Sequence, residues 1–403
     1  MRSLTARYEA LFRHAGAARF AALSLVMRMP IGTLGLATLL HVRDLTGSIA
    51  VAGSVVGTQF VASAITAPIL GRLVDTRGPR GVLLVTGLVA PLATATMLAA
   101  GWIGLPRPAL FATAIAAGAF MPPVTVLIRT LWRMRLADAT ARQTAFALDA
   151  VLLELAYTLG PLAIALAILA SATAAMAVAT LFTALAVPLL FASGGLRWWT
   201  PQPPGERHWL GPLTQTRLLA IYGATALLTT AFGALEVGYP AFARAAGADG
   251  WGPVLIAINA AGSAVGGLVY GGLRLRTPLP RLLPWLMGAL ALPVACHLPI
   301  TSPWGLVPFA LAAGALIAPA MTTVSLLVSS IAPARYATEA FTWSATAIVT
   351  GIGIGMASGG AMVERFGPNG AFGVAVATAL AGAALALAVR GRGTLPPAPD
   401  AAR

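Results

Sequence analysis

Twelve apolar runs, each long enough to cross a lipid bilayer, are the feature that most constrains the fold of this 403-residue chain. A helix needs about 20 apolar residues to cross a hydrocarbon layer of about 30 Å. Only 9% of the residues are charged and 58% are hydrophobic, whereas about a quarter of a soluble domain is charged. The sequence therefore predicts an all-α membrane protein with twelve transmembrane helices. The predicted spans are 17–41, 48–71, 81–103, 109–131, 144–168, 174–194, 214–240, 251–273, 282–300, 305–331, 339–363 and 370–390.

All 26 basic residues are arginine, and their distribution indicates the topology. The predicted spans place twenty of them on one side of the membrane and four on the other, a bias typical of cytoplasmic against external loops. We therefore expect a multi-pass protein of the cell membrane with both termini in the cytoplasm. The net charge of +14 then reflects topology, not binding to nucleic acid. The four external arginines are Arg43, Arg107, Arg244 and Arg365.

Short motifs recur at a nearly constant offset and indicate two similar halves. Six spans precede and six follow a segment rich in tryptophan and proline, which cannot form a continuous helix. We predict a six-helix bundle at 1–194, a cytoplasmic linker at 195–213, and a second bundle with a short cytoplasmic tail at 214–403. The recurring positions are 116–119 with 312–315, Pro123 with Pro319, 145–146 with 340–341, Gly71 with Gly271, Leu73 with Leu273, and Gln59 with Asn259.

The most specific motif lies between the second and third spans. It reads Gly71-Arg72-Leu73-Val74-Asp75-Thr76-Arg77-Gly78-Pro79-Arg80. Gly71 permits close helix approach, Asp75 can accept hydrogen bonds from the positive N-terminus of a neighbouring helix, and Gly78 can turn the chain. In the second half the acidic position is Leu275, so that copy has lost the charge.

This segment, called the signature loop (71–80) below, resembles the signature loop of the major facilitator superfamily. The resemblance covers nearly the whole chain. It implies two pseudo-symmetric six-helix bundles with a substrate site between them near the middle of the membrane. It also implies a gating role in the conformational cycle for the loop residues Gly71, Arg72, Asp75, Arg77, Gly78 and Arg80.

Gly160-Pro161 in the fifth span resembles the antiporter motif of drug and proton exchangers, which favours export. The match is partial, and a simple proline bend explains the pair as well. The sequence around Arg28 to Pro30 and Arg129 to Arg133 resembles an actinobacterial branch of the superfamily.

Small residues repeat at four-residue spacing in spans 2, 5, 8 and 11. Such stripes let helices approach closely, and the resemblance implies that these four helices meet between the halves. Generic helix packing is an equally good explanation of any single stripe. The stripes are Gly53 and Gly57, Ala156 and Gly160, Gly262 and Gly266, and Gly351, Gly355 and Gly359.

Charges inside spans suggest function, because they cost several kcal/mol unless they are paired or hydrated. Counted from the predicted span starts, Arg28 and Glu154 lie at similar depth and could pair. That pair is a candidate for proton or substrate coupling, and a fixed ion pair between spans 1 and 5 is the alternative. Arg129 and Asp149 are predicted to form a structural pair beside the signature loop. Glu236, Gln59, Asn259, Tyr157 and Trp343 complete the candidate cavity.

These features predict a secondary active transporter that exports a small organic molecule by proton antiport and alternating access. The predicted partners are the substrate, the lipid bilayer and protons, with no nucleic acid, and the chain is expected to be monomeric. No phosphate-binding P-loop and no HExxH pair occurs, so we expect no enzyme activity, catalytic residue, metal or cofactor. An uptake symporter or facilitator, a membrane enzyme, and a sensor that no longer transports are the alternatives.

Overall fold

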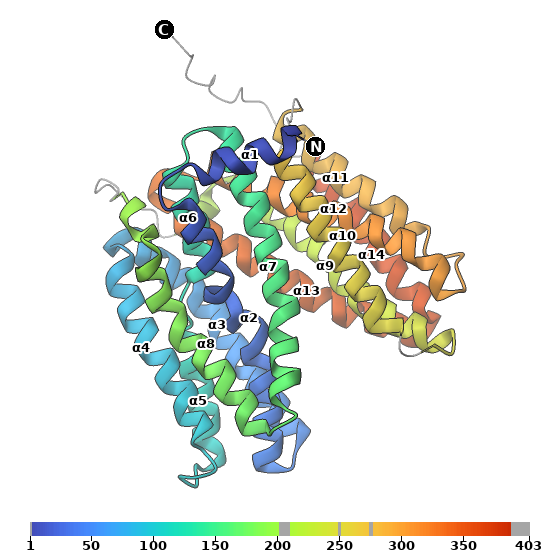
Figure 1. Ribbon diagram of the computed structural model, residues 1–403. Helices are drawn as coiled ribbons and strands as arrows, with labels where there is room; N and C mark the ends of the chain where they lie inside the picture. Colours follow the sequence, from blue (N-terminus) through green and yellow to red (C-terminus); the bar gives the residue numbers. More distant parts are fainter. Residues whose placement is uncertain (1, 201–209, 249–250, 274–276, 388–403) are drawn as a thin grey trace.

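The computed structural model describes residues 2–200, 210–248, 251–273 and 277–387. In this part of the chain every regular element is a helix (Figure 1). The α-helices are α1 (Arg2–Phe12), α2 (Ala17–Thr46), α3 (Ile49–Arg77), α4 (Pro79–Leu98), α5 (Arg107–Ala119), α6 (Val124–Arg135), α7 (Ala139–Ala167), α8 (Ala172–Ser193), α9 (Thr216–Ala245), α10 (Trp251–Gly272), α11 (Leu279–Ala295), α12 (Pro303–Ile331), α13 (Ala337–Phe366) and α14 (Pro368–Leu387).

The twelve predicted spans are confirmed. Eleven segments are long and apolar enough to cross a membrane, and α11 is a shorter apolar helix that supplies the remaining span. One span differs in detail from the uninterrupted helix that its apolar pattern predicts, because the fourth consists of α5 and α6 with a break at residues 120–123. The break contains Pro122 and Pro123, whose nitrogens cannot donate to the helix ladder.

Both halves use the same internal packing. Gly118 of α5 lies against the backbone of Gln59 in α3, and Gly314 of α12 lies against the backbone of Asn259 in α10. Both glycines are needed for this close approach, because a Cβ at either position would overlap the facing carbonyl oxygen. The recurring motifs therefore reflect the same contact between a glycine and a facing helix backbone, which occurs once in each half.

The halves meet through a pair of equivalent phenylalanines. Phe146 of α7 and Phe341 of α13 occupy the same position of the repeat, and their ring centroids are 6.0 Å apart in an edge-to-face arrangement. Each side chain is 1% exposed. Contact between equivalent positions is expected where a two-fold axis passes.

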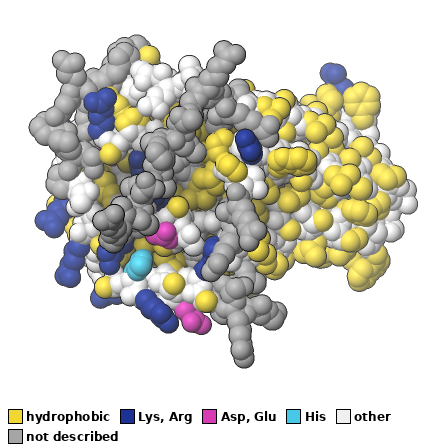
Figure 2. Space-filling model, turned by 90° about the horizontal axis from the view of Figure 1, so that it is seen from above, with side chains coloured by type: hydrophobic (Ala, Val, Ile, Leu, Met, Phe, Trp, Pro, Cys, Tyr) yellow, Lys and Arg dark blue, Asp and Glu magenta, His cyan; other side chains and the backbone are white. Residues whose placement is uncertain are grey.

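We call the end of the molecule that carries α1 and the linker the linker side, and the opposite end the far side. In Figure 1 the linker side is at the top, where α1 lies across the bundle ends. Figure 2 views this end, where arginine side chains gather while apolar side chains cover the flank of the molecule. Part of the linker (201–209), the tail from 388 onward and Leu275 lie outside the described residues.

The small-residue stripes serve packing inside each half. Gly160 contacts α2, Gly266 contacts α12, and Gly355 contacts α9, and all three contacts lie within a single bundle. The four helices do meet between the halves as expected, α3 with α13 and α7 with α10, but the named small residues of spans 5, 8 and 11 pack against helices of their own half. A four-residue spacing identifies a close contact but does not say which helix is the partner.

Candidate functional site

Asp75 joins the two halves on the linker side. It lies near the end of α3, is 5% exposed, and accepts hydrogen bonds from the backbone N–H groups of Thr338 (3.0 Å) and Glu339 (2.8 Å). These N–H groups belong to the first turn of α13 and have no acceptor within that helix. The carboxylate therefore caps the positive end of a helix in the other half, and the predicted contact is confirmed.

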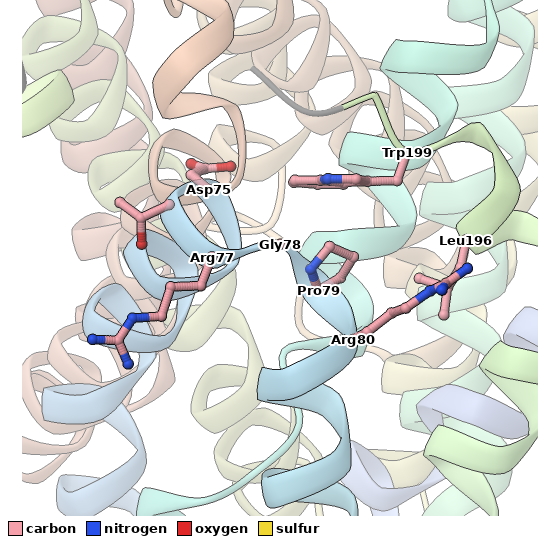
Figure 3. A pocket seen from close by; sticks show the side chains of 8 residues that line it. Asp75, Arg77, Gly78, Pro79, Arg80, Leu196 and Trp199 are labelled. Atoms are coloured by element: carbon pink, nitrogen blue, oxygen red, sulfur yellow. The ribbon is translucent and has the colours of Figure 1, made fainter. Parts of the chain in front are cut away.

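The glycines of the signature loop have the expected geometric roles. Gly71 faces Thr342 of α13 so closely that a Cβ would overlap its hydroxyl oxygen. Gly78 has a φ of 81° and separates α3 from α4, a conformation that a residue with a side chain rarely adopts. Arg77 and Arg80 are exposed and line a pocket at this turn (Figure 3). Arg72 is half-buried.

The C-terminal end of α10 is also capped by side chains from the other half. The Gln143 amide donates to the carbonyl oxygens of Tyr270 (2.7 Å) and Leu273 (3.1 Å), and the Thr144 hydroxyl donates to that of Gly271 (2.7 Å). The last carbonyls of a helix have no donor within it. Gln143 and Thr144 therefore donate hydrogen bonds to carbonyl oxygens at the end of α10 that have no donor within the helix.

Three further donors cross between the halves on the linker side. The Tyr8 hydroxyl of α1 donates to the carbonyl oxygen of Leu268 at 2.9 Å, and Arg7 donates to that of Leu273. Arg133 of α6 donates to the carbonyl of Ala332, directly after α12, at 2.6 Å. The sequence alone identifies none of these five donors, because nothing in their local pattern distinguishes them from other polar residues at helix ends.

The same helices separate towards the far side. The faces of α3 and α13 touch at Gly71 and Thr342, but further along these faces a Cβ at Gly57 of α3, or at Gly353 of α13, would meet nothing within 4 Å. Gly53 is open in the same way. Figure 1 shows the two bundles spreading apart in this direction. The structure is therefore closed on the linker side and open on the far side.

Three charges form a cluster inside the N-terminal half. Asp149 of α7 pairs with Arg28 of α2 through one oxygen and with Arg129 of α6 through the other, the latter at 2.9 Å. The three residues are 0–4% exposed. The expected contact of Arg129 with Asp149 is present, whereas the expected pairing of Arg28 with Glu154 is wrong. Helix α7 begins at 139, not at 144, so Asp149 and not Glu154 lies level with Arg28.

The cluster holds two positive charges and one negative charge. The Nε and Nη1 atoms of Arg28 have no hydrogen-bond partner among the described residues. A buried cation with unused donors is costly. Asp149 is therefore the side chain on which the burial of both arginines depends.

Two further carboxylates lie inside spans without such partners. Glu154 is near the middle of α7 and Glu236 is in the half of α9 nearer the far side, and both are half-buried. Neither forms an ion pair within the part of the chain that the structure describes. Their charges interact with each other. Tyr157, one turn from Glu154, is 43% exposed, and its hydroxyl interacts electrostatically with Glu154 and Arg129.

The other predicted cavity residues are distributed differently. Asn259 is buried inside the C-terminal half, where its amide donates to the Ala310 carbonyl at 3.0 Å and to the Tyr239 hydroxyl at 3.3 Å. Gln59 is likewise buried, at 5% exposure. Trp343 is half-buried, and its indole N–H has no partner among the described residues. Glu154 thus lies near Glu236 and near Tyr157, whereas the amide of Asn259 is bound to partners within its own half.

No group of three or more His, Cys, Asp or Glu residues that could hold a metal ion occurs within the described ranges.

Comparison with known proteins agrees with this architecture. A sequence model described as the Major Facilitator Superfamily matches residues 20–348. No curated protein sequence matches the chain. Among solved structures, a bacterial homologue of the iron transporter ferroportin in an outward-facing state is similar, with a TM-score of 0.78, 11% identity, and coverage of 93% of this chain and 99% of that one.

Two other transporters have the same fold. The fucose:proton symporter of E. coli gives a TM-score of 0.70 at 10% identity, covering 93% of this chain and 98% of that one. A human organic anion transporter gives 0.68 at 16% identity, covering 93% and 99%. Identities this low concern the fold alone.

Proposed function

We propose that this chain, which belongs to the Major Facilitator Superfamily, exports a small organic molecule in exchange for protons by alternating access. Its family is one of membrane transporters, so the chain is a transporter and not an enzyme. The direction of transport, the exchange for protons and the cell membrane as its location are the proposal. The residues that we assign to this mechanism are the signature loop, the cluster of Arg28, Arg129 and Asp149, and the carboxylates of Glu154 and Glu236.

The observation that carries the proposal is the pair Glu154 and Glu236. One carboxylate comes from each half, each is half-buried within a span, and neither has an arginine partner among the described residues. A carboxylate without a fixed cation can gain and lose a proton as its surroundings become wet or dry. Because the halves move relative to each other during alternating access, such a pair can be exposed to each side in turn.

The arginine distribution supports the orientation. Most arginines lie in the loops of the linker side, which we assign to the cytoplasm. The open far side then faces outward, and Asp75 with its partners closes the cytoplasmic side. On a Cys296→Ala background, a membrane-impermeant maleimide added to intact cells should label Thr46→Cys but not Arg281→Cys. The opposite pattern would overturn the orientation.

Coupling to protons can be tested with a library of candidate substrates. In everted vesicles acidified by respiration, a compound exchanged for protons dissipates the pH gradient, which a fluorescent weak base reports. We expect some members of the library to do so with the wild type and not with empty vesicles. Glu154→Gln and Glu236→Gln should abolish the response because a neutral amide carries no proton.

The matched control is Glu364→Gln on α13, an exposed glutamate at the far end of a span, which should respond like the wild type. Wild-type responses in both glutamine variants would remove these carboxylates from the mechanism. A gradient that dissipates only when the compound and protons start on the same side would identify a symporter instead.

A further inference from the structure

We propose that the Tyr157 hydroxyl stabilises the deprotonated form of Glu154 and links it to the buried cluster of Arg28, Arg129 and Asp149. Tyr157 thereby sets the pH range in which Glu154 exchanges its proton. It acts through Glu154 and is therefore a positioning residue. This role rests on the proposed function of Glu154 as a proton site, and it adds the residue that adjusts the proton affinity of that site.

Glu154 and Tyr157 lie on one open face of α7. The part of this helix nearer the far side has three faces, which the exposure of its side chains distinguishes at three- and four-residue spacing. The buried face contains Ala156, Gly160 and Ile164. The apolar exposed face contains Leu155, Leu159, Leu162 and Leu166. The third face contains Glu154, Tyr157 and Pro161. Because Glu154 lies near Glu236 of the other half, this third face borders the space between the halves.

The Tyr157 hydroxyl is available to both Glu154 and the cluster. Tyr157 is 43% exposed and lies near Glu154 and near Arg129. Its hydroxyl forms no hydrogen bond within the described ranges. Arg129 bonds Asp149 through Nε alone, and its two Nη groups have no hydrogen-bond acceptor in the part of the chain that the structure describes. A tyrosine hydroxyl can donate to a carboxylate and accept from a guanidinium at the same time.

The cluster supplies a positive charge for this arrangement. It holds two arginines and one aspartate, and Nε and Nη1 of Arg28 have no partner among the described residues. Glu154 lies on the same helix as Asp149, five residues further along the chain. A hydrogen bond and a nearby cation both favour the charged form of a carboxyl group. Tyr157 and the cluster therefore favour release of the proton from Glu154, whereas the negative charge of Glu236 opposes it.

The other helices around α7 add no charge at this level. Helices α8, α10 and α12 also pack against α7 and carry no charged residue. The remaining charged residues of α2, α6, α7 and α9, and the histidine of α2, lie near the ends of these helices. Helix α1 lies across the linker-side ends (Figure 1). The groups that set the proton affinity of Glu154 are therefore Tyr157, Glu236 and the cluster.

Infrared spectroscopy of the purified protein measures the proton on Glu154 without a substrate. A protonated carboxyl group gives a C=O stretching band that disappears on deprotonation, and a pH titration follows this band. We expect Glu154→Gln to lack one titrating band of the wild type, which assigns that band to Glu154. In Tyr157→Phe the same band should persist to a pH about one to two units higher, which is a proton affinity about ten- to a hundredfold greater, because one hydrogen bond to a charged group is lost.

Tyr270→Phe is the matched control. It also removes a tyrosine hydroxyl inside a span, but that hydroxyl bonds Thr323 within the C-terminal half at 2.6 Å. The Glu154 band should titrate in this variant as in the wild type. In the double variant Tyr157→Phe, Glu154→Gln the band should be absent, which shows that the shift belongs to Glu154.

An unshifted band in Tyr157→Phe, or an equal shift in Tyr270→Phe, would exclude this role of Tyr157 and leave the proposed function intact. If Glu154→Gln lacked no titrating band, Glu154 would not exchange a proton, and both the role of Tyr157 and the proposed function of Glu154 would fail.

Discussion

The core of the N-terminal half holds charges where the core of the C-terminal half holds serines. In the repeat, Asp149 corresponds to Ser344 and Arg129 to Ser325, and both serines are buried, with 2% and 5% exposure. Helix α9, which corresponds to α2, carries no charged residue between Arg217 and Glu236. Both halves nevertheless form the same bundle. The cluster is therefore not required by the six-helix fold, and its presence in one half points to a task in that half.

A second difference concerns the closed linker side. The N-terminal half supplies the side chains, and the C-terminal half supplies helix ends. Asp75 caps the start of α13, while Gln143 and Thr144 cap the end of α10. In the C-terminal half the position of Asp75 is occupied by Leu275. Closure therefore depends on a few side chains of one half acting on the backbone of the other.

The largest effect is expected from Asp149→Asn. Two buried arginines would lose the one carboxylate with which they pair among the described residues, and a broken buried ion pair costs about 3–5 kcal/mol of the free energy of unfolding. Denaturant unfolding of the purified protein in micelles measures it. Ser344→Ala, at the equivalent position of the other half, is the matched control and should cost about 1 kcal/mol or less.

The combined variant Arg28→Met, Arg129→Ser and Asp149→Ser sharpens this test. It places serine where the C-terminal half has Ser325 and Ser344 and removes the third charge, and removal of a whole buried cluster is often neutral for stability. We therefore expect unfolding near that of the wild type together with a loss of transport. If the combined variant were as unstable as Asp149→Asn, the cluster would be a structural requirement of the N-terminal half, and the comparison of the cores would fail.

Asp75→Asn is expected to shift the conformational equilibrium. It removes the charge and one of two acceptors from the cap on α13, and hydrogen bonds to a charged group contribute about 1.5–3 kcal/mol. The closed linker side should open about ten- to a hundredfold more often. Alkylation of Thr342→Cys on a Cys296→Ala background reports this, since Thr342 is 1% exposed against Gly71 in the closed state.

The control for that experiment is Asp44→Asn, an exposed acid at the far end of α2, which should leave the alkylation rate unchanged. An unchanged rate in Asp75→Asn would show that the other crossing contacts hold the linker side closed without it.

The sequence was sufficient for the elements and for the signature loop, because both depend on local patterns. Apolar length identifies a span, and the spacing of Gly71, Asp75 and Gly78 constrains one tight turn beside one helix start. The partner of Arg28 was missed for a different reason. The prediction depended on where α7 begins, and polar residues 139–143 extend that helix beyond the apolar run.

Helix α1 and the five donors on the linker side could not be found in this way. Tyr8 and Gln143 act on carbonyl oxygens more than a hundred residues away, and no local pattern encodes such a distance. The break between α5 and α6 was visible as Pro122-Pro123. Prolines also occur inside continuous spans such as α3 and α8. The Pro122-Pro123 pair alone therefore does not predict a break in the fourth span.

Gly118→Ala and Gly314→Ala test whether the two halves are equivalent where they are packed alike. In each case the new methyl group would overlap a carbonyl oxygen of the facing helix, and overpacking of this kind costs about 1–3 kcal/mol. We expect similar losses of thermal stability in both variants. Gly360→Ala on α13, where a Cβ would meet nothing within 4 Å, is the control. A large loss of thermal stability in only one of the two variants would show that the shared glycine contact contributes differently to the two bundles.

The smallest effect is expected from Tyr8→Phe. This variant tests whether α1 contributes to the closure of the linker side by side chains of the N-terminal half. Burial raises the pKa of the Tyr8 hydroxyl to about 12, so it remains a donor to the Leu268 carbonyl at any physiological pH. Loss of one such bond costs about 0.5–1.5 kcal/mol, which corresponds to a two- to tenfold increase in alkylation of Thr342→Cys. Tyr270→Phe removes an equivalent hydroxyl that bonds Thr323 within the C-terminal half at 2.6 Å. It should lower thermal stability without changing the alkylation rate, because both partners of its bond lie within the C-terminal half. If both variants raised the rate equally, α1 would have no specific part in closure, and the linker side would be held by the contacts of α3, α6 and α7.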